Sequence, residues 1–115
     1  VRHIAGEGTV SIIDLEKNQV DAEIIVGLHP CGLILSPDGQ YLLIANAGSD
    51  TLSVIDRSSH QVLETIWTKE NASQLFGAMP NALVFARDGK QLFVCNGGMN
   101  GVALIEFNPG RSELE

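Results

Sequence analysis

A histidine and a cysteine two positions apart, His29 and Cys31, are the side chains of this chain best suited to chemistry. An imidazole nitrogen and a thiolate sulfur are good ligands for a soft metal or haem iron. Residues i and i+2 point the same way only if an extended strand has already begun at the first of them. A third ligand at workable spacing is missing from the sequence, so we expect no metal and no other cofactor.

Motifs of the common catalytic classes are absent from the sequence. It has no Gly-x-Ser-x-Gly elbow, no phosphate-binding glycine loop and no cysteine-rich metal cluster. Ser58, Ser59 and His60 are adjacent, and we interpret them as a polar hairpin rather than a catalytic pair. The two cysteines, Cys31 and Cys95, are too few for a disulfide scaffold, and we interpret both as half-buried apolar groups. We therefore assign no catalytic residue.

Composition excludes several classes of partner. The 115 residues carry a formal net charge of −7, and the seven lysines and arginines are scattered. Nucleic acids and anionic membranes are bound by clustered basic side chains, so neither is an expected partner. No apolar run approaches the roughly 20 residues that span a bilayer. The 44% of hydrophobic residues suits a folded globular chain.

The candidate side chains are carried by a unit that repeats along the chain. Its central copy, residues 30–56, reads as three short strands with Ser-Pro-Asp-Gly as the first turn. In such a turn proline presets the first corner and glycine takes the positive φ that closes it. Shifts of 50 residues forward and 42 residues back find further copies. Matching positions include Pro30 and Pro80, Leu33 and Leu83, Asp38 and Asp88, Asn46 and Asn96, Thr9 and Thr51, and Ile13 and Ile55.

The two shifts differ by eight residues, and the excess lies between Ile66 and Met79. We place an insertion loop at residues 68–78, which carries Leu75 and Phe76. Long loops on rigid scaffolds often carry function, so this loop is a candidate interface. The alternative is that Leu75 and Phe76 cap the adjacent repeat. The candidate interface or funnel residues are His29, Cys31, Trp67, Leu75, Phe76 and Met79.

A period of about 42 residues with short strands predicts an all-β fold made of β-propeller blades. We expect a half blade of two outer strands at residues 1–27 and a complete blade at residues 28–67. After the insertion, residues 79–115 form an incomplete third blade of three strands. A propeller needs about four blades to close, and about 2.5 are here. We therefore expect a segment of a larger propeller, or several chains that close a ring together.

The repeat resembles the YVTN-type β-propeller repeat, named for the end of its second strand. The matching tetrads are Leu-Ile-Ala-Asn at residues 43–46 and Phe-Val-Cys-Asn at residues 93–96, each followed by a strand that ends in an acidic residue. Ile4 departs from the pattern, since it stands where the asparagine belongs. The resemblance implies a closed propeller, often of seven blades, in secreted or surface proteins. Residues 79–105 also resemble propellers fused to phosphoesterases of the alkaline-phosphatase type.

These observations favour a non-catalytic propeller segment that acts as an interaction or assembly scaffold in the periplasm or outside the cell. Its partners would be the remaining blades of the same propeller or other protein chains. The alternative is part of a propeller enzyme, lactonase-like or a cofactor-dependent oxidoreductase, or the accessory propeller of a phosphoesterase. Asn46 and Asn96 recur at equivalent positions, so we interpret both as structural residues that bond turn amides.

Overall fold

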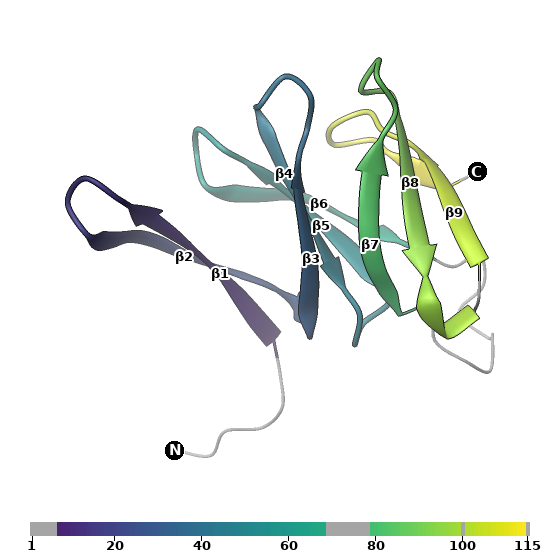
Figure 1. Cartoon of the computed structure of the whole chain (residues 1–115), viewed down its shortest axis with the longest axis horizontal. Helices are drawn as coiled ribbons and strands as arrows, with labels where there is room; N and C mark the ends of the chain where they lie inside the picture. The colour runs from purple at the N-terminus through teal and green to yellow at the C-terminus, as the bar shows by residue number, and fades with distance from the viewer. Residues whose placement is uncertain (1–6, 69–78, 100, 115) are drawn as a thin grey trace.

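Three antiparallel sheets stand side by side in the chain, which is known from a computed structural model that describes residues 7–68, 79–99 and 101–114 (Figure 1). The first sheet has two strands, and the second and third have four each. Consecutive strands pair in every sheet, so each sheet is a meander with the order expected of a propeller blade. Within the described residues, no helix is long and apolar enough to cross a membrane.

The strands are short and follow the repeat. The first sheet contains β1 (Glu7–Asp14) and β2 (Gln19–Leu28). The middle sheet contains β3 (Pro30–Leu35), β4 (Tyr41–Asn46), β5 (Thr51–Asp56) and β6 (Gln61–Trp67). The third sheet contains β7 (Pro80–Phe85), β8 (Gln91–Asn96), β9 (Gly101–Glu106) and β10 (Glu113–Leu114).

The third sheet corrects the expectation of three strands, because β10 is a fourth strand that pairs with β9. A two-residue strand is too short to show the alternation of apolar and polar residues that marks a strand in a sequence. Residues 1–6 of the expected half blade lie outside the described residues, as does most of the predicted insertion loop, residues 69–78. The sequence Gly-Glu-Gly at residues 6–8 predicts a turn, but β1 already begins at Glu7.

The turn between the first two strands of each four-stranded sheet forms as its residue types predict. Gly39 has a φ of 76° and donates its N–H to the Ser36 carbonyl oxygen at 2.8 Å. Gly89 has a φ of 73° and makes the equivalent bond to Ala86 at 3.0 Å. Asp38 accepts hydrogen bonds from the Ser36 hydroxyl and the Gln40 amide, and these bonds lower the pKa of its carboxyl group.

The middle sheet is covered on both faces, so β4 is apolar along almost its whole length. Leu42 and Ile44 point toward the first sheet, where they pack with Val10, Ile24 and Val26. Leu43 and Ala45 point the opposite way, into a second cluster shared with the third sheet. This second cluster contains Leu43, Ala45, Leu52, Val54, Ile66, Leu92, Val94, Ile105 and Phe107.

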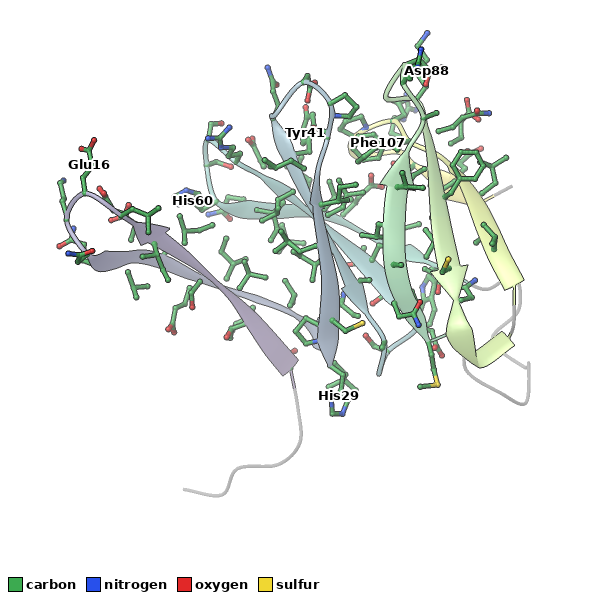
Figure 2. The ribbon with its side chains drawn as sticks, viewed as in Figure 1. Glu16, His29, Tyr41, His60, Asp88 and Phe107 are labelled. Carbon is green, nitrogen blue, oxygen red and sulfur yellow. The ribbon has the colours of Figure 1, made fainter. Side chains whose placement is uncertain are left out.

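Aromatic rings close one end of the cluster between the middle and third sheets. Phe107 makes edge-to-face contacts with Tyr41, at 5.9 Å between ring centroids, and with Phe85, at 5.2 Å. Tyr41 and Phe107 face each other across the two sheets near the hairpin ends (Figure 2). Such pairs add about 0.5–1.5 kcal/mol each beyond their buried area, so this cluster ties the two sheets together.

Candidate functional site

His29 and Met79 occupy the same structural position in two successive sheets. Each precedes the proline that begins an innermost strand, and each has a left-handed φ, 48° for His29 and 50° for Met79. Their carbonyl oxygens accept equivalent hydrogen bonds, from Ala47 N at 3.1 Å and from Gly97 N at 3.2 Å. His29 is exposed and projects from the lower end of β3, away from the sheets (Figure 2). The backbone conformation and its hydrogen bond thus repeat at these two positions although the residue types differ.

The prediction that both cysteines are half-buried is wrong, because both thiols are free and exposed. Cys31 donates its Sγ–H to the Pro80 carbonyl oxygen at 3.3 Å, which links β3 to β7. Cys95 lies on β8, opposite Ala82 of β7 and Val102 of β9. In the described part of the chain, no three His, Cys, Asp or Glu side chains gather as a metal-binding group.

Trp67 ends β6 and is 57% exposed. It lines a cavity of about 570 Å³ between β2 and the β5–β6 pair. Thr51 and Thr65 also line this cavity, as does Ile25 from the first sheet. Leu75 and Phe76, the other bulky residues proposed for the interface, lie outside the described residues.

Asp50 accepts hydrogen bonds from both Thr68 and Met79, the described residues at the two ends of the connection that follows Trp67. Its carbonyl oxygen accepts bonds from the N–H and hydroxyl of Thr68, at 3.0 and 2.9 Å. Its side-chain Oδ1 accepts the N–H of Met79 at 2.9 Å. Asp50 has a φ of 59°, a conformation in which aspartate and asparagine are enriched. Thr68 and Met79, the described residues on either side of residues 69–78, are therefore both held by the turn between β4 and β5.

The recurring asparagines do not bond turn amides as predicted. Asn46 donates its Nδ2 hydrogens to Ser53 Oγ at 2.9 Å and to Thr51 Oγ1 at 3.3 Å, both on the next strand. Asn96 donates instead to the carbonyl oxygen of Thr68, in the neighbouring sheet, at 2.9 Å. Gly27 packs so closely on Asn46 that a Cβ there would lie 2.7 Å from Asn46 Cγ. Both asparagines are buried and structural, with different partners.

The Ser-Ser-His stretch forms a hairpin turn. Asp56 Oδ1 accepts the N–H and the hydroxyl of Ser58, at 3.0 and 2.9 Å. These bonds lower the pKa of the Asp56 carboxyl group. His60 closes the turn with a φ of 59° and donates its N–H to the Asp56 carbonyl oxygen at 2.8 Å. The serine hydroxyl therefore serves the turn and shows no bond to the histidine ring.

An apolar face of the third sheet has no covering element among the described residues. We call it the open face; it comprises Ala82, Val84, Phe93, Cys95 and Val102. Val84 and Phe93 pair across β7 and β8, and Val102 is 65% exposed on β9. A shift of 50 residues relates Phe93, Cys95 and Val102 to three residues of the middle sheet, Leu43, Ala45 and Leu52. Those three are 0% exposed, and they pack against the third sheet.

A comparison with protein families matches residues 8–115 to the lactonase family of seven-bladed β-propellers. The chain belongs to this family. The match extends through β1 to β10, so all three sheets of this lactonase-family segment are propeller blades or parts of blades. The predicted all-β propeller fold is therefore confirmed.

Solved structures agree with this assignment. The lactonase-family segment is 28% identical to hydrazine synthase from Kuenenia stuttgartiensis, with a TM-score of 0.72, covering 93% of this chain and 30% of that one. A protein of unknown function from Desulfotomaculum acetoxidans is 20% identical, with a TM-score of 0.66 and coverages of 91% and 32%. A candidate 6-phosphogluconolactonase from Bacteroides uniformis is 16% identical, with a TM-score of 0.70 and coverages of 95% and 35%. The chain thus spans about a third of each of these structures. No curated protein matches it.

Two features of this lactonase-family segment escaped the sequence analysis. The first is that His29 and Met79 are equivalent corners, which the shift of 50 residues would have revealed if both positions had been aligned. The second is the open face, which the same shift relates to a buried interface. In both cases the shift of 50 residues relates positions that are structurally equivalent although their residue types differ.

Proposed function

We propose that this chain is a non-catalytic propeller segment that serves as an assembly scaffold, and that its open face binds a further blade. The observation that carries the proposal is the repeat equivalence between this face and a closed interface. Leu43 and Leu52 are 0% exposed between the middle and third blades, whereas Phe93 and Val102 are 38% and 65% exposed. A face built on the same pattern is suited to the same kind of partner.

The partner would be another blade of the same propeller or a blade of another chain. The buried interface in the structure indicates its chemistry, since the open face corresponds to the side of the middle blade that receives Leu92, Val94 and Ile105. A partner with a similar apolar strand surface would fill the open face. The family's description as a seven-bladed propeller supports this requirement for further blades. The resemblance to YVTN-type repeats supports a site of action in the periplasm or outside the cell.

A second candidate is that the segment forms part of a propeller enzyme. The lactonase family description supports it, as does the likeness to a candidate 6-phosphogluconolactonase. A cofactor-dependent oxidoreductase and the accessory propeller of a phosphoesterase are further forms of this candidate. Hydrolysis of 6-phosphogluconolactone by the chain above the spontaneous rate, and its loss in His29→Ala, would favour the lactonase form over a scaffold.

Sedimentation velocity tests the scaffold proposal. Without other blades, we expect the open face to be covered by a second copy, so that the chain associates as its concentration rises. Phe93→Asp places a charge at the centre of this face and should abolish the association, because an unpaired buried charge is costly. Leu15→Asp is the matched control, since Leu15 is 82% exposed in the β1–β2 hairpin and should associate as the native chain does. A folded monomer at all concentrations would contradict the proposal.

A further inference from the structure

We propose that the cavity between β2 and the β5–β6 pair is a binding site for a neutral saccharide. Its volume of about 570 Å³ lies in the usual range for small-ligand sites. The cavity lies on the face of the middle blade that turns toward the first sheet, away from the open face. The inference is independent of the proposed scaffold function because it uses different residues.

A row of hydroxyl groups forms the polar part of this cavity. Ser49, Thr51 and Ser53 come from β5 and the turn before it, and Thr65 pairs with Ser53 across β5 and β6. Thr51 and Ser53 are 5% and 3% exposed, whereas Ser49 is half-buried and Thr65 is exposed. They are the kind of precisely held polar group that orients a ligand in an otherwise apolar pocket.

Asn46 fixes the direction in which these hydroxyls act. Its two Nδ2 hydrogens go to Ser53 Oγ and Thr51 Oγ1, so both hydroxyls accept from the amide. Leu28 N donates to Ser49 Oγ at 3.1 Å, and Ser49 Oγ lies 3.0 Å from Thr51 Oγ1. One hydroxyl hydrogen of the Ser49–Thr51 pair, and that of Ser53, find no acceptor among the described residues. Because Thr51 and Ser53 are almost fully buried, the half-buried Ser49 and the exposed Thr65 are the hydroxyl groups that can donate to the oxygens of a ligand.

Trp67 supplies an apolar platform beside the hydroxyl row. Thr51 and Trp67 lie directly opposite each other in the β5–β6 pairing, which puts the indole next to the polar groups. The face of an indole ring is electron-rich, so it attracts the partly positive C–H groups of a sugar ring. Ile25, 61% exposed, and Val62, 40% exposed, extend the apolar surface. An aromatic platform next to several hydroxyl donors fits a molecule with both C–H faces and hydroxyl edges.

The charges at the cavity favour a neutral ligand. No lysine or arginine lines it, and Glu7 is its one charged lining residue among those described. A phosphorylated or carboxylated sugar would meet a carboxylate without a compensating cation. The hydroxyls are also particular to this blade, because the equivalents of Thr51 and Ser53 in the third blade are Gly101 and Ala103.

Trp67 is the single tryptophan of the chain, so its fluorescence reports on this cavity directly. We expect D-glucose or cellobiose to change the emission saturably, while sodium gluconate at equal ionic strength does not. No saturable change with either neutral sugar would overturn the proposal. Equal or tighter binding of gluconate would overturn the assignment to a neutral ligand.

Variants locate the binding. Thr65→Val removes one exposed hydroxyl without changing the side-chain volume, and it should weaken the affinity about fivefold, the loss expected for one hydrogen bond. Thr9→Val is the matched control, because Thr9 is an exposed strand threonine that does not line the cavity. It should bind as the native chain does. Native affinity in Thr65→Val, or equal losses in both variants, would place any binding elsewhere and refute the site.

Discussion

Replacing Leu43 by alanine is expected to lower the free energy of unfolding by about 2–5 kcal/mol, the cost of a cavity in a closed core. Leu43 is 0% exposed and lies between the middle and third blades with Leu52 and Leu92. Its neighbours belong to two separate sheets, so the truncation leaves a cavity at the interface between the middle and third blades. Urea-induced unfolding, followed by circular dichroism, measures the change.

The matched variant is Phe93→Ala, at the position 50 residues further along. Phenylalanine is larger than leucine, and in a closed core its loss costs about 3–5 kcal/mol. Because Phe93 is 38% exposed on the open face, we expect this variant to lose less than Leu43→Ala at a chain concentration where the protein is monomeric. A cost as large as that of Leu43→Ala would show that the open face is already covered.

Replacing Glu64 by alanine is expected to destabilise the chain by about 2 kcal/mol, because hydrogen bonds to a charged group contribute about 1.5–3 kcal/mol each and partial exposure reduces this. Glu64 of the middle blade holds the turn at residues 108–112 of the third blade. Its Oε1 accepts from Gly110 N at 3.0 Å and from the Ser112 hydroxyl at 2.8 Å. Its Oε2 accepts the N–H of Ser112 at 3.1 Å.

Two variants distinguish the effect of the hydrogen bonds to Glu64 from a general effect of its charge. Glu64→Gln keeps one acceptor oxygen and should lose about half as much stability. Glu23→Ala removes an exposed carboxylate from β2 that makes no hydrogen bond to another described residue, and it should change stability little. Hydrogen exchange at Gly110 and Ser112 provides the local measurement. Exchange that is no faster in Glu64→Ala than in the native chain would argue that Glu64 does not hold this turn.

Local features of the fold could be predicted from the sequence because their causes are local. The Ser-Pro-Asp-Gly turn follows from the backbone preferences of its own residues, and Gly39 and Gly89 adopt the positive φ that closes it. The spacing of β3 to β5 follows from the repeat. Apolar runs such as β4 indicated a sheet covered on both faces.

The remaining features depend on contacts between blades. Asn46 and Asn96 have the same sequence context, yet one bonds hydroxyls of its own sheet and the other a carbonyl of the neighbouring blade. Cys95 is exposed because no described element covers the open face of its sheet, which its own sequence context does not reveal. The saccharide cavity likewise combines residues from the first and middle sheets, and no stretch of sequence contains them together.

The thiol of Cys95 allows the most direct test of the open face as a blade interface. Cys95 stands where the middle blade has Ala45, which is 0% exposed, and Cys31→Ser leaves it as the single thiol. The rate at which a thiol reagent modifies Cys95 is measured while the chain concentration is raised, in the Cys31→Ser chain that is otherwise native and in the same chain with Phe93→Asp. We predict that modification slows as the native chain associates and stays fast in Phe93→Asp. Equally fast modification in the associated and monomeric forms would contradict the account.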